Sequence, residues 1–297
     1  MSLCLIAIFK NESHILKEWI IHYLNQGVEK FFLIDNGSTD NYFPIIEPYI
    51  KRHIIYLVKD SKPYSQVELY NKYFLKVCKR YTWVIICDLD EFIYARKCFK
   101  KITGYLQYIN NNYNYISQIF IPWKMFSSNG YNKIDKLQPE SVITSFTKRF
   151  DYNKDKSVDG ITFKENNNTF TYTKCIVKTI YLLKFDIHSH KLIPNFNNYY
   201  NYITPLNINI NNINNIHTNM SHCKINEKIL NNSFLNLNHY PIQSLDYFSR
   251  VKMKRDDAVY NKNVRNKKYF YRYDINSNDK DDYELSEISN NYVKFDF

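Results

Sequence analysis

WVIICDLDEF, residues 83–92, joins an apolar run of strand length to three carboxylates in residues 88–91. A buried strand that ends in acidic side chains places them at the edge of an α/β sheet where ligands bind. Asp88 and Asp90 stand at i and i+2, so both side chains can face one divalent cation if the extended backbone continues. An isolated Asp-x-Asp pair is more often a solvated turn, and it is the surrounding sequence that favours a binding site here.

Strand and helix patterns alternate along the first hundred residues. Apolar runs at 3–9, 30–34 and 54–58 predict three further strands, and helical spacing at 12–26 and 67–80 predicts helices between them. Strands separated by helix-length segments indicate βαβ units and a parallel sheet. We therefore expect an α/β fold in which helices cover both faces of a mostly parallel, Rossmann-like sheet.

Polar side chains follow several strands of this predicted sheet. One cluster, residues 35–40, comes after the second strand, and another, residues 88–91, after the fourth. Asn11 and Glu12 follow the first strand in the same way. The carboxyl ends of parallel strands meet at one edge, so these groups are expected to line a nucleotide pocket. Helix capping is an equally good account of Asn11 and Glu12, and it is the preferred role for Asp40.

The composition favours an anionic partner. The 297 residues include 40 Lys and Arg against 29 Asp and Glu, a formal net charge of +11. This charge suits phosphates, nucleotides, nucleic acid or an acidic membrane surface. With only 5 Gly, the chain contains neither a G-x-G-x-x-G nor a Walker-type phosphate loop.

The cysteine pattern and the hydropathy of the sequence predict a reducing, cytosolic compartment. The 6 Cys form no C-x-x-C pair, and Cys4 and Cys87 sit in strand-like runs, which predicts buried free thiols in a reducing compartment. No apolar run approaches a membrane span, and residues 3–9 predict a first strand rather than a signal peptide. We expect a cytosolic protein, soluble or peripheral. Its Asn, Tyr and Ile bias is typical of an AT-rich genome such as that of a large virus, which would make the compartment the host cytosol.

The second half of the chain is less regular. Residues 119–126 and 142–150 are predicted as strands, and a helix is expected over about 244–259. Residues 195–215 are biased to Asn, Ile and Tyr, and we expect a loop there. The polar tail from Asn276 onward is expected to be attached only loosely.

Taken together and in order, several of these stretches resemble the family 2-like and family 92-like glycosyltransferases. The stretches that carry the resemblance are FKNE (9–12), EWIIHY (18–23), GV (27–28), DNGSTD (35–40), W with DLDEF (83–92), WKMFSSNG (123–130), NHYPIQS (238–244) with Phe248, Lys252 and Arg255, and Gln66, Tyr70 and Asn71. Ser127 stands where Gly is usual, Gln243 where Lys is usual and Asp256 where Gly is usual. Each stretch alone is weak evidence of the family, whereas the whole set in this order is specific to it.

The resemblance implies a GT-A fold with one nucleotide-binding sheet and an acceptor-side half. It divides the chain into one domain at 1–260, with a nucleotide-sugar-binding half (1–100) and an acceptor half (101–260), followed by a basic and then acidic extension (261–297). It also implies transfer of a sugar from a nucleotide-diphosphate sugar, with a UDP-sugar favoured, to a hydroxyl of a glycan or glycoprotein, with inversion. The implied cofactor is Mn²⁺ or Mg²⁺.

The resemblance implies that the acidic stretch at residues 88–91 forms the metal site. A nucleoside diphosphate is a poor leaving group until its charge is neutralised, and a cation held by one or two carboxylates does this. Asp90 is expected to bind the metal directly, and Asp88 to contact the metal, its bound water or the ribose. His239 is expected to be the third ligand, and Glu91 to support the loop.

The nucleotide is expected to contact residues from several elements. Asp35 is assigned to the base or ribose, and Asn11, Glu12 and Gln66 to the nucleotide pocket. The departing diphosphate is expected to be neutralised by cations that follow His239, because guanidinium and ammonium groups bind phosphate oxygens. These cations are Arg250, Lys252 and Arg255.

An inverting transfer needs a general base that removes the proton of the acceptor hydroxyl. The candidates for this base are Asp186, Glu140, Asp159 and His188. Their spacing in the sequence does not identify which of them acts. We favour Asp186, with His188 beside it. His188 alternates with His190, so both imidazoles lie on one face of a strand.

Three other functions fit parts of the sequence. A phosphatase of the haloacid-dehalogenase kind also has Asp-x-Asp after a strand, but it needs Thr or Val where Phe92 stands, and its strand comes first. A nucleotidyltransferase needs an early Gly-rich loop. A basic, aromatic-rich nucleic-acid-binding protein would use residues 267–273 for stacking, but it leaves the carboxylates at 88–91 unexplained.

Overall fold

A computed structural model describes residues 1–131, 141–154, 156–193, 202–203, 221–255 and 264–295 of the protein. Within these ranges the helices are α1 (Ser13–Asn25), α2 (Phe43–Lys51), α3 (Gln66–Tyr73), α4 (Ile102–Asn112), α5 (Val142–Ser145), α6 (Glu227–Asn232), α7 (Leu245–Arg250), α8 (Lys267–Asn276) and α9 (Glu284–Ser289). The strands are β1 (Leu3–Phe9), β2 (Lys30–Asp35), β3 (Ile55–Lys59), β4 (Trp83–Ile86), β5 (Glu91–Ala95), β6 (Gln118–Met125), β7 (Lys148–Arg149), β8 (Phe163–Glu165), β9 (Asn168–Lys178), β10 (Leu182–Lys184), β11 (Lys191–Leu192), β12 (Tyr202–Ile203), β13 (His222–Lys224), β14 (Leu235–His239) and β15 (Lys280–Asp281).

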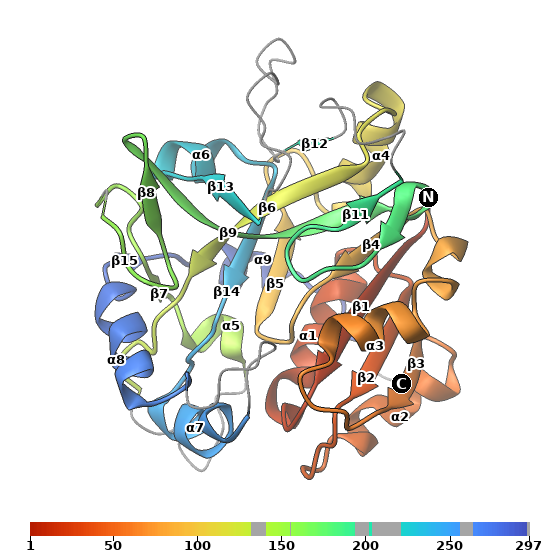
Figure 1. Ribbon diagram of the computed structural model, residues 1–297, viewed down its shortest axis with the longest axis horizontal. Coiled ribbons are helices and arrows are strands. Elements are labelled where there is room, and N and C mark those ends of the chain that lie inside the picture. Colours follow the sequence, from red (N-terminus) through yellow and green to blue (C-terminus); the bar gives the residue numbers. More distant parts are fainter. Residues whose placement is uncertain (132–140, 155, 194–201, 204–220, 256–263, 296–297) are drawn as a thin grey trace.

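The main sheet has the strand order β3-β2-β1-β4-β9-β6-β14-β5. Strands β3, β2, β1 and β4 are parallel neighbours. Strand β9 runs antiparallel to both β4 and β6, and β14 runs parallel to β6 and antiparallel to β5. Figure 1 shows the parallel N-terminal strands on the right and most of the second half of the chain on the left, with β11 above β4 on the right. The predicted α/β class with a mostly parallel sheet is confirmed.

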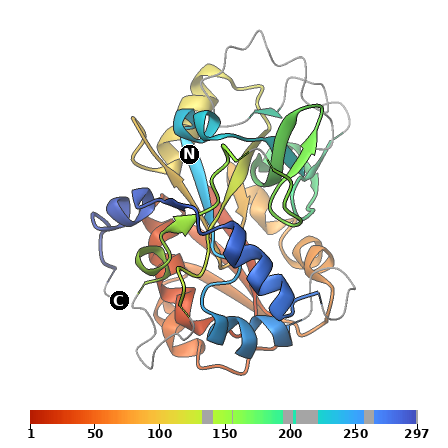
Figure 2. The same cartoon turned by 90° about the vertical axis from the view of Figure 1, so that its left-hand side faces the viewer.

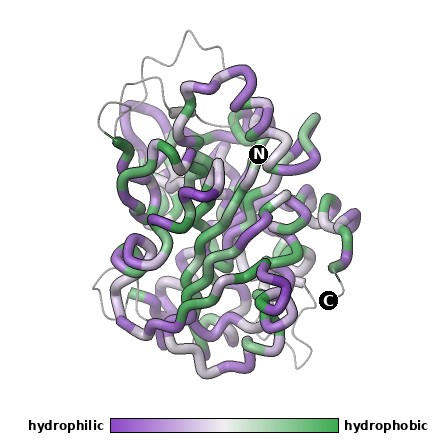
Figure 3. The backbone as a smooth tube through the Cα atoms, turned by 90° about the vertical axis from the view of Figure 1, so that its right-hand side faces the viewer, coloured by the Kyte–Doolittle hydropathy of each residue, from purple (hydrophilic) through white to green (hydrophobic). Residues whose placement is uncertain are grey.

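Strand β1 is buried on both faces, which explains its unbroken apolar sequence. Leu5 packs in a hydrophobic cluster that includes Trp19 of α1. The next residue, Ile6, packs in a second cluster that includes Tyr70 of α3. Successive side chains of a strand point to opposite faces, so helices have to cover both faces of this part of the sheet. The central strands are correspondingly hydrophobic along most of their length (Figure 3).

Residues 142–150, predicted as a strand, instead form helix α5 followed by the short strand β7. The start of α5 is fixed by two side chains. Ser141 Oγ accepts a hydrogen bond from the Thr144 N–H at 3.1 Å, and Glu18 Oε2 accepts one from the Val142 N–H at 2.7 Å. Glu18 belongs to α1, so the local sequence alone does not reveal this cap.

Two predicted helices end earlier than expected. Helix α3 stops at Tyr73 and α7 at Arg250, and a short 3₁₀ turn follows each of them, at Val77–Arg80 and Lys252–Lys254. The predicted loop at 195–215 lies outside the described residues except for Tyr202 and Ile203, which pair with β6 as strand β12.

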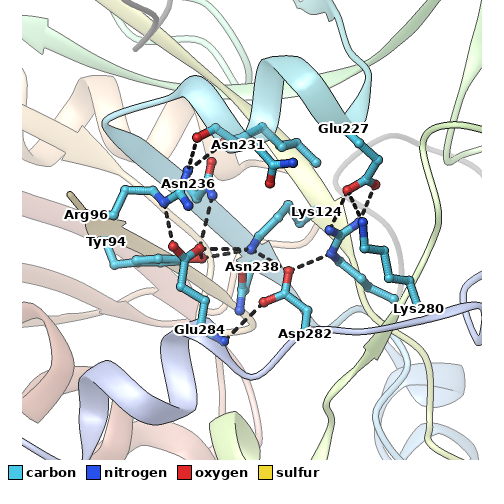
Figure 4. Close-up of polar contacts among 12 residues, drawn as sticks. Tyr94, Arg96, Lys124, Glu227, Asn231, Asn236, Asn238, Lys280, Asp282 and Glu284 are labelled. Carbon is cyan, nitrogen blue, oxygen red and sulfur yellow. Dashed lines mark hydrogen bonds and ion pairs between the residues drawn. The ribbon is translucent and has the colours of Figure 1, made fainter.

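The polar tail expected to be loose is instead anchored by buried ion pairs. Asp282 accepts hydrogen bonds from Lys124 Nζ at 2.8 Å and from Arg149 Nε at 2.6 Å. Glu284 accepts one from Arg96 Nε at 2.6 Å, and Leu285 lies in the main core. Figure 4 shows Asp282 and Glu284 directed toward these cations of the sheet. The polar sequence of the tail suggested a solvated segment, because the cations that pair with Asp282 and Glu284 lie far away in the sequence.

Helix α8 lies on the flank of the molecule opposite the parallel strands (Figure 1). Figure 2 shows it crossing that flank next to α7. The division of the chain into a nucleotide half, an acceptor half and an extension stays a prediction. None of the helices in the described ranges is long and apolar enough to cross a membrane.

Candidate active site

A cavity of about 600 Å³ opens where β1 and β4 end. Its walls come from residues just after β1, from the segment before α3, from the turn after β4, and from β9, β14 and α8. Nine of the side chains singled out in the sequence line it: Glu12, Gln66, Asp88, Asp90, Asp159, His188, His239, Lys252 and Arg255. The βα topology therefore brings together groups separated by more than two hundred residues of sequence.

Asp88 is held by two polar side chains. Its Oδ1 accepts a hydrogen bond from Gln66 Nε2 at 3.2 Å, and its Oδ2 accepts one from Lys174 Nζ at 2.9 Å. Burial by itself raises the pKa of Asp88, but the charge and hydrogen bond of Lys174 outweigh burial, so the pKa lies below its ordinary value. Asp88 is therefore a carboxylate already neutralised by a protein cation.

Lys174 is a site residue that the sequence did not reveal. It lies in the interior of β9 with a side chain only 1% exposed, and its Nζ is 3.5 Å from Glu91 Oε2. Its one sequence signal is a lysine in the middle of the apolar and β-branched run at residues 169–177. A carboxylate partner offsets the cost of burying such a cation, and Asp88 in the turn after β4 provides one.

Asp90 uses its two oxygens differently. Oδ2 accepts a hydrogen bond from Lys252 Nζ at 2.5 Å, whereas Oδ1 lies 3.7 Å from His239 Nε2. Burial alone raises the pKa of Asp90, but Lys252 and His239 together hold it below its ordinary value. Asp90 is thus ionised near neutral pH, and its Oδ1 faces an imidazole nitrogen.

His239 reaches this position because β14 pairs with β5. The register places His239 opposite Glu91, and the Tyr240 N–H donates to the Asp90 carbonyl at 2.8 Å. The imidazole packs against Trp123, with ring centroids 4.3 Å apart. Burial lowers the pKa of His239 to about 4 even though the Asp90 carboxylate acts in the opposite direction. The imidazole is therefore neutral near pH 7 and able to bind a metal ion.

Glu12 joins the same network from the amino end of α1. Its Oε1 accepts hydrogen bonds from Arg255 Nη2 at 2.9 Å and from Tyr247 OH at 3.3 Å, and it lies 3.4 Å from Lys252 Nζ. Two carboxylates, Glu12 and Asp90, thus share two cations. Lys252 and Arg255 were expected to face a diphosphate, and in the structure they contact the carboxylates of Asp90 and Glu12.

Glu91 supports the turn, as expected. Its Oε2 accepts a hydrogen bond from the Asp88 N–H at 3.0 Å, and the side chain is fully buried. Burial raises the pKa of Glu91 to about 8 against the opposing charge of Lys174. The carboxyl group is therefore mostly protonated at neutral pH.

The side chains present could hold a divalent cation with two protein ligands rather than three. No group of three or more His, Cys, Asp or Glu side chains suited to a metal occurs in the described part of the chain. Asp90 Oδ1 and His239 Nε2 offer one carboxylate oxygen and one neutral nitrogen that face each other, while both oxygens of Asp88 have protein partners. Mg²⁺ and similar cations at phosphate sites take one or two carboxylates and complete their shell with water and substrate oxygens.

Four predicted residues are absent from the cavity lining of the described residues: Asn11, Asp35, Arg250 and Asp186. Asp35 accepts hydrogen bonds from the Ser38 N–H and from Tyr42 OH, both at 2.7 Å. Its neighbour Asn36 lines the cavity instead.

Each of the other three has local partners. Asn11 Oδ1 accepts a hydrogen bond from the Thr39 N–H at 2.7 Å, and Arg250 pairs with Asp246 on the exposed side of α7. Asp186 Oδ1 accepts one from the N–H of the following residue, Ile187, at 2.7 Å.

The candidate bases are distributed differently from the expectation. His188 and Asp159 line the cavity, whereas Glu140 lies outside the described residues. The His188 Nδ1 lies 2.8 Å from the Thr173 carbonyl, so Nδ1 is the donor and Nε2 is left as the acceptor. Burial lowers the pKa of His188 to about 4.

A family model described as glycosyltransferase family 92 matches residues 1–262 of the chain. A glycosyltransferase family 92 protein of Ricinus communis is 30% identical over 98 residues, which cover 31% of this chain and 17% of that protein. A second, of Oryza sativa subsp. japonica, is 26% identical over 157 residues, which cover 50% of this chain and 25% of that protein. The chain therefore matches a quarter or less of the length of these relatives.

Solved structures show more distant likenesses. S. aureus TarS 1-349 in complex with UDP has a TM-score of 0.33 and 18% identity, covering 44% of this chain and 37% of that chain. Glucosyl-3-phosphoglycerate synthase from Mycobacterium tuberculosis, in complex with Mn²⁺, UDP and glucosyl-3-phosphoglycerate, has a TM-score of 0.30 and 10% identity, covering 61% of this chain and 58% of that chain.

Proposed function

This chain belongs to glycosyltransferase family 92, and from that membership we propose that it transfers a sugar from a nucleoside-diphosphate sugar, with a UDP-sugar favoured, to a hydroxyl group of a glycan or glycoprotein. The observation that carries the proposal is the cavity at the ends of β1 and β4. There Asp90 and His239 face each other beside Lys252 and Arg255. A site for a cation next to a site for an anion suits a metal-bound diphosphate.

In the proposed reaction, an acceptor hydroxyl oxygen forms a bond to the anomeric carbon of the sugar. The bond between that carbon and the diphosphate oxygen breaks, and the diphosphate leaves with the electron pair. The hydroxyl proton passes to a general base. Attack from the face opposite the leaving group inverts the anomeric carbon, as the family resemblance implies. The protein has to stabilise the leaving diphosphate and accept one proton.

Asp90 and His239 are the residues that would hold Mn²⁺ or Mg²⁺ in this proposal. When bound, the cation supplies positive charge that neutralises the diphosphate as it departs. Asp90 Oδ1 and the neutral His239 Nε2 are the atoms suited to bind it. Asp88, whose two oxygens contact Gln66 and Lys174, is better placed to orient the ribose.

Lys252 and Arg255 are proposed to bind the diphosphate oxygens. Lys252 Nζ lies 2.5 Å from Asp90 Oδ2, and Arg255 Nη2 lies 2.9 Å from Glu12 Oε1. These contacts hold two cations in a buried site where they would otherwise be costly. A diphosphate that enters the cavity offers the same cations a second set of anionic oxygens, with a bidentate geometry available to Arg255.

We propose His188 as the general base, in preference to Asp186. His188 lines the cavity with Nε2 as the acceptor nitrogen, whereas Asp186 is not among the lining residues. The low pKa of His188 keeps the imidazole unprotonated at neutral pH. It can therefore accept a proton at the moment when the acceptor oxygen loses it.

A hydrolysis screen tests the proposal. The protein is incubated with UDP- and GDP-sugars, with Mn²⁺ or with EDTA, and release of nucleoside diphosphate is measured. We expect release from at least one donor with Mn²⁺, loss of release with EDTA, and a decrease of about a hundredfold or more for Asp90→Ala.

Asp246→Ala is the matched control, because Asp246 is an acid that pairs with Arg250 on the exposed side of α7. Its rate should equal that of the wild type. Thermal melting of both variants separates a catalytic loss from unfolding. Equal turnover by Asp90→Ala, or no release from any donor by the wild type, would refute the proposal.

A further inference from the structure

Helix α8 contributes to the active-site cavity although it lies beyond the residues that match the family. The family match ends at residue 262, and α8 begins at Lys267. Nevertheless, Arg265, Tyr269, Arg272 and Tyr273 line the same cavity as Asp88 and Asp90. The part of the cavity wall that α8 forms therefore lies outside the matched region.

The aromatic side chains of this wall form a stack. The rings of Tyr269 and Tyr273 are nearly parallel, at 18°, with centroids 4.4 Å apart. Tyr269 also stacks on Phe248 of α7, with centroids 5.8 Å apart and an angle of 14°. Phe248 and Tyr273 are buried, so the two rings that stack on Tyr269 are fixed, and the partly exposed Tyr269 ring lines the cavity in a defined orientation.

The stack is tied to the loop before β8. Tyr273 OH donates a hydrogen bond to the Gly160 carbonyl at 2.9 Å. Gly160 has φ +80, and a Cβ at this position would lie 2.2 Å from the Tyr273 hydroxyl oxygen. Glycine is therefore required both by the backbone conformation and by the close approach of the ring. The contact fixes α8 relative to the neighbouring Asp159.

Polar groups border the aromatic surface. Arg272 forms an ion pair with Asp159, and the two side chains are 34% and 80% exposed. The Arg272 guanidinium lies 5.2 Å from the centre of the Tyr269 ring. Tyr269, Arg272 and Asp159 all line the cavity. One short wall thus combines an aromatic ring, a hydrogen-bond donor group and a hydrogen-bond acceptor group.

We propose that this wall is a subsite for the sugar residue of the acceptor, a proposal that rests on the function proposed above. A sugar presents hydroxyls that both donate and accept hydrogen bonds, together with C–H faces that pack on aromatic rings. Asp159 accepts from such hydroxyls, Arg272 donates to them, and the exposed part of the Tyr269 ring contacts the C–H groups of the sugar. The donor diphosphate has Lys252 and Arg255 elsewhere in the cavity.

The position of the wall agrees with this assignment. The segment from Ser61 to Gln66, before α3, lines the cavity from the parallel half of the sheet, where the nucleotide is expected. Figure 1 shows α3 and α8 on opposite sides of the molecule. An acceptor held by α8 would therefore approach the reacting carbon from the side away from the nucleotide.

The experiment measures transfer and hydrolysis in the same samples. The probes are the donor cleaved in the hydrolysis screen and four acceptors: methyl β-D-galactoside, methyl β-D-glucoside, methyl α-D-mannoside and methyl N-acetyl-β-D-glucosaminide. We expect the wild type to glycosylate at least one. Tyr269→Ala and Arg272→Ala should each lower the ratio of transfer to hydrolysis by about tenfold, chiefly through a higher acceptor KM.

Two further variants complete the test. Tyr269→Phe keeps the ring and should retain most of the transfer, and Tyr271→Ala, on the exposed side of the same helix, should match the wild type. Melting temperatures show whether each variant is folded. An unchanged transfer ratio in folded Tyr269→Ala and Arg272→Ala would overturn the subsite, as would a wild type that cleaves a donor but glycosylates none of the four glycosides. A wild type that cleaves no donor contradicts the proposed function instead.

Discussion

Replacing Asp282 with Asn removes a negative charge that two buried cations share. Lys124 and Arg149 contact the Asp282 carboxylate at 2.8 and 2.6 Å, and their side chains are only 2% and 4% exposed. Asn keeps the shape of the side chain but offers one acceptor oxygen and no charge. Breaking a buried pair by removing one partner costs about 3–5 kcal/mol, because the remaining charge stays buried without compensation.

The lower end of this range applies to Asp282→Asn. Arg149 keeps its pair with Glu227 at 2.7 Å, and Lys124 keeps Glu284 at 3.7 Å. We therefore expect a loss of about 3 kcal/mol, which lowers the melting temperature of a chain of this length by roughly 6 °C. The assay is thermal unfolding followed by circular dichroism, with Asp281→Asn as the control because Asp281 is exposed.

The effect should depend on pH in a defined direction. Burial alone raises the pKa of Asp282, but Lys124 and Arg149 outweigh burial and hold it below its ordinary value. The stabilisation by Asp282 is therefore complete above the pKa of about 4 in the unfolded chain, and it is lost as the pH falls toward the folded pKa. The difference between wild type and variant should shrink as the pH falls below about 4. A melting temperature for Asp282→Asn within about 1 °C of the wild type near neutral pH would contradict this reasoning.

Two further predictions concern stability. Gly160→Ala should lower the free energy of unfolding, measured by denaturant unfolding, by about 1–3 kcal/mol more than Gly130→Ala. Both glycines have positive φ, but only at Gly160 would a Cβ meet Tyr273. Equal losses for the two variants would show that the Tyr273 ring moves aside. Glu91→Gln should stabilise the protein relative to wild type more at pH 8 than at pH 5, since burial raises the pKa of Glu91 to about 8 and its folded state loses stability as the pH rises toward that value. Glu287→Gln, at an exposed position, should show no such trend, and a pH-independent difference for Glu91→Gln would count against the assigned ionisation.

The first half of the fold could be predicted because its strands β1, β2 and β4 are buried on both faces. Strands with this burial read as continuous apolar runs such as residues 3–9, which local sequence displays directly. Helix α5 could not be predicted, because Glu18, in a different helix, accepts the N–H of Val142. The tail could not be predicted either, since the partners of Asp282 lie in β6 and β7.

The same distinction applies to the candidate site. Asp88 and Asp90 follow β4, and strand ends at one edge of a sheet converge by topology alone. His239, the last residue of β14, was expected at the site only from the family resemblance. Lys174 was missed because it enters the site on β9, an antiparallel strand whose neighbours cannot be read from its own sequence. The sequence of α8 is recognisably basic and aromatic, but nothing in it predicts that the helix lines the cavity. What could be predicted was the chemistry of the short motifs, and what could not was the set of partners that long-range pairing brings to them.

Strand β9 has a consequence for how substrates enter. It pairs with β4 over residues 176–178 and with β6 over residues 173–177, so one strand joins the parallel N-terminal strands to the rest of the sheet. Spreading the two sides of the cavity apart would break these hydrogen bonds close to the buried Lys174 side chain. We therefore expect the sheet to move as one unit, and the admission of a substrate to depend on side chains and connecting segments at the rim.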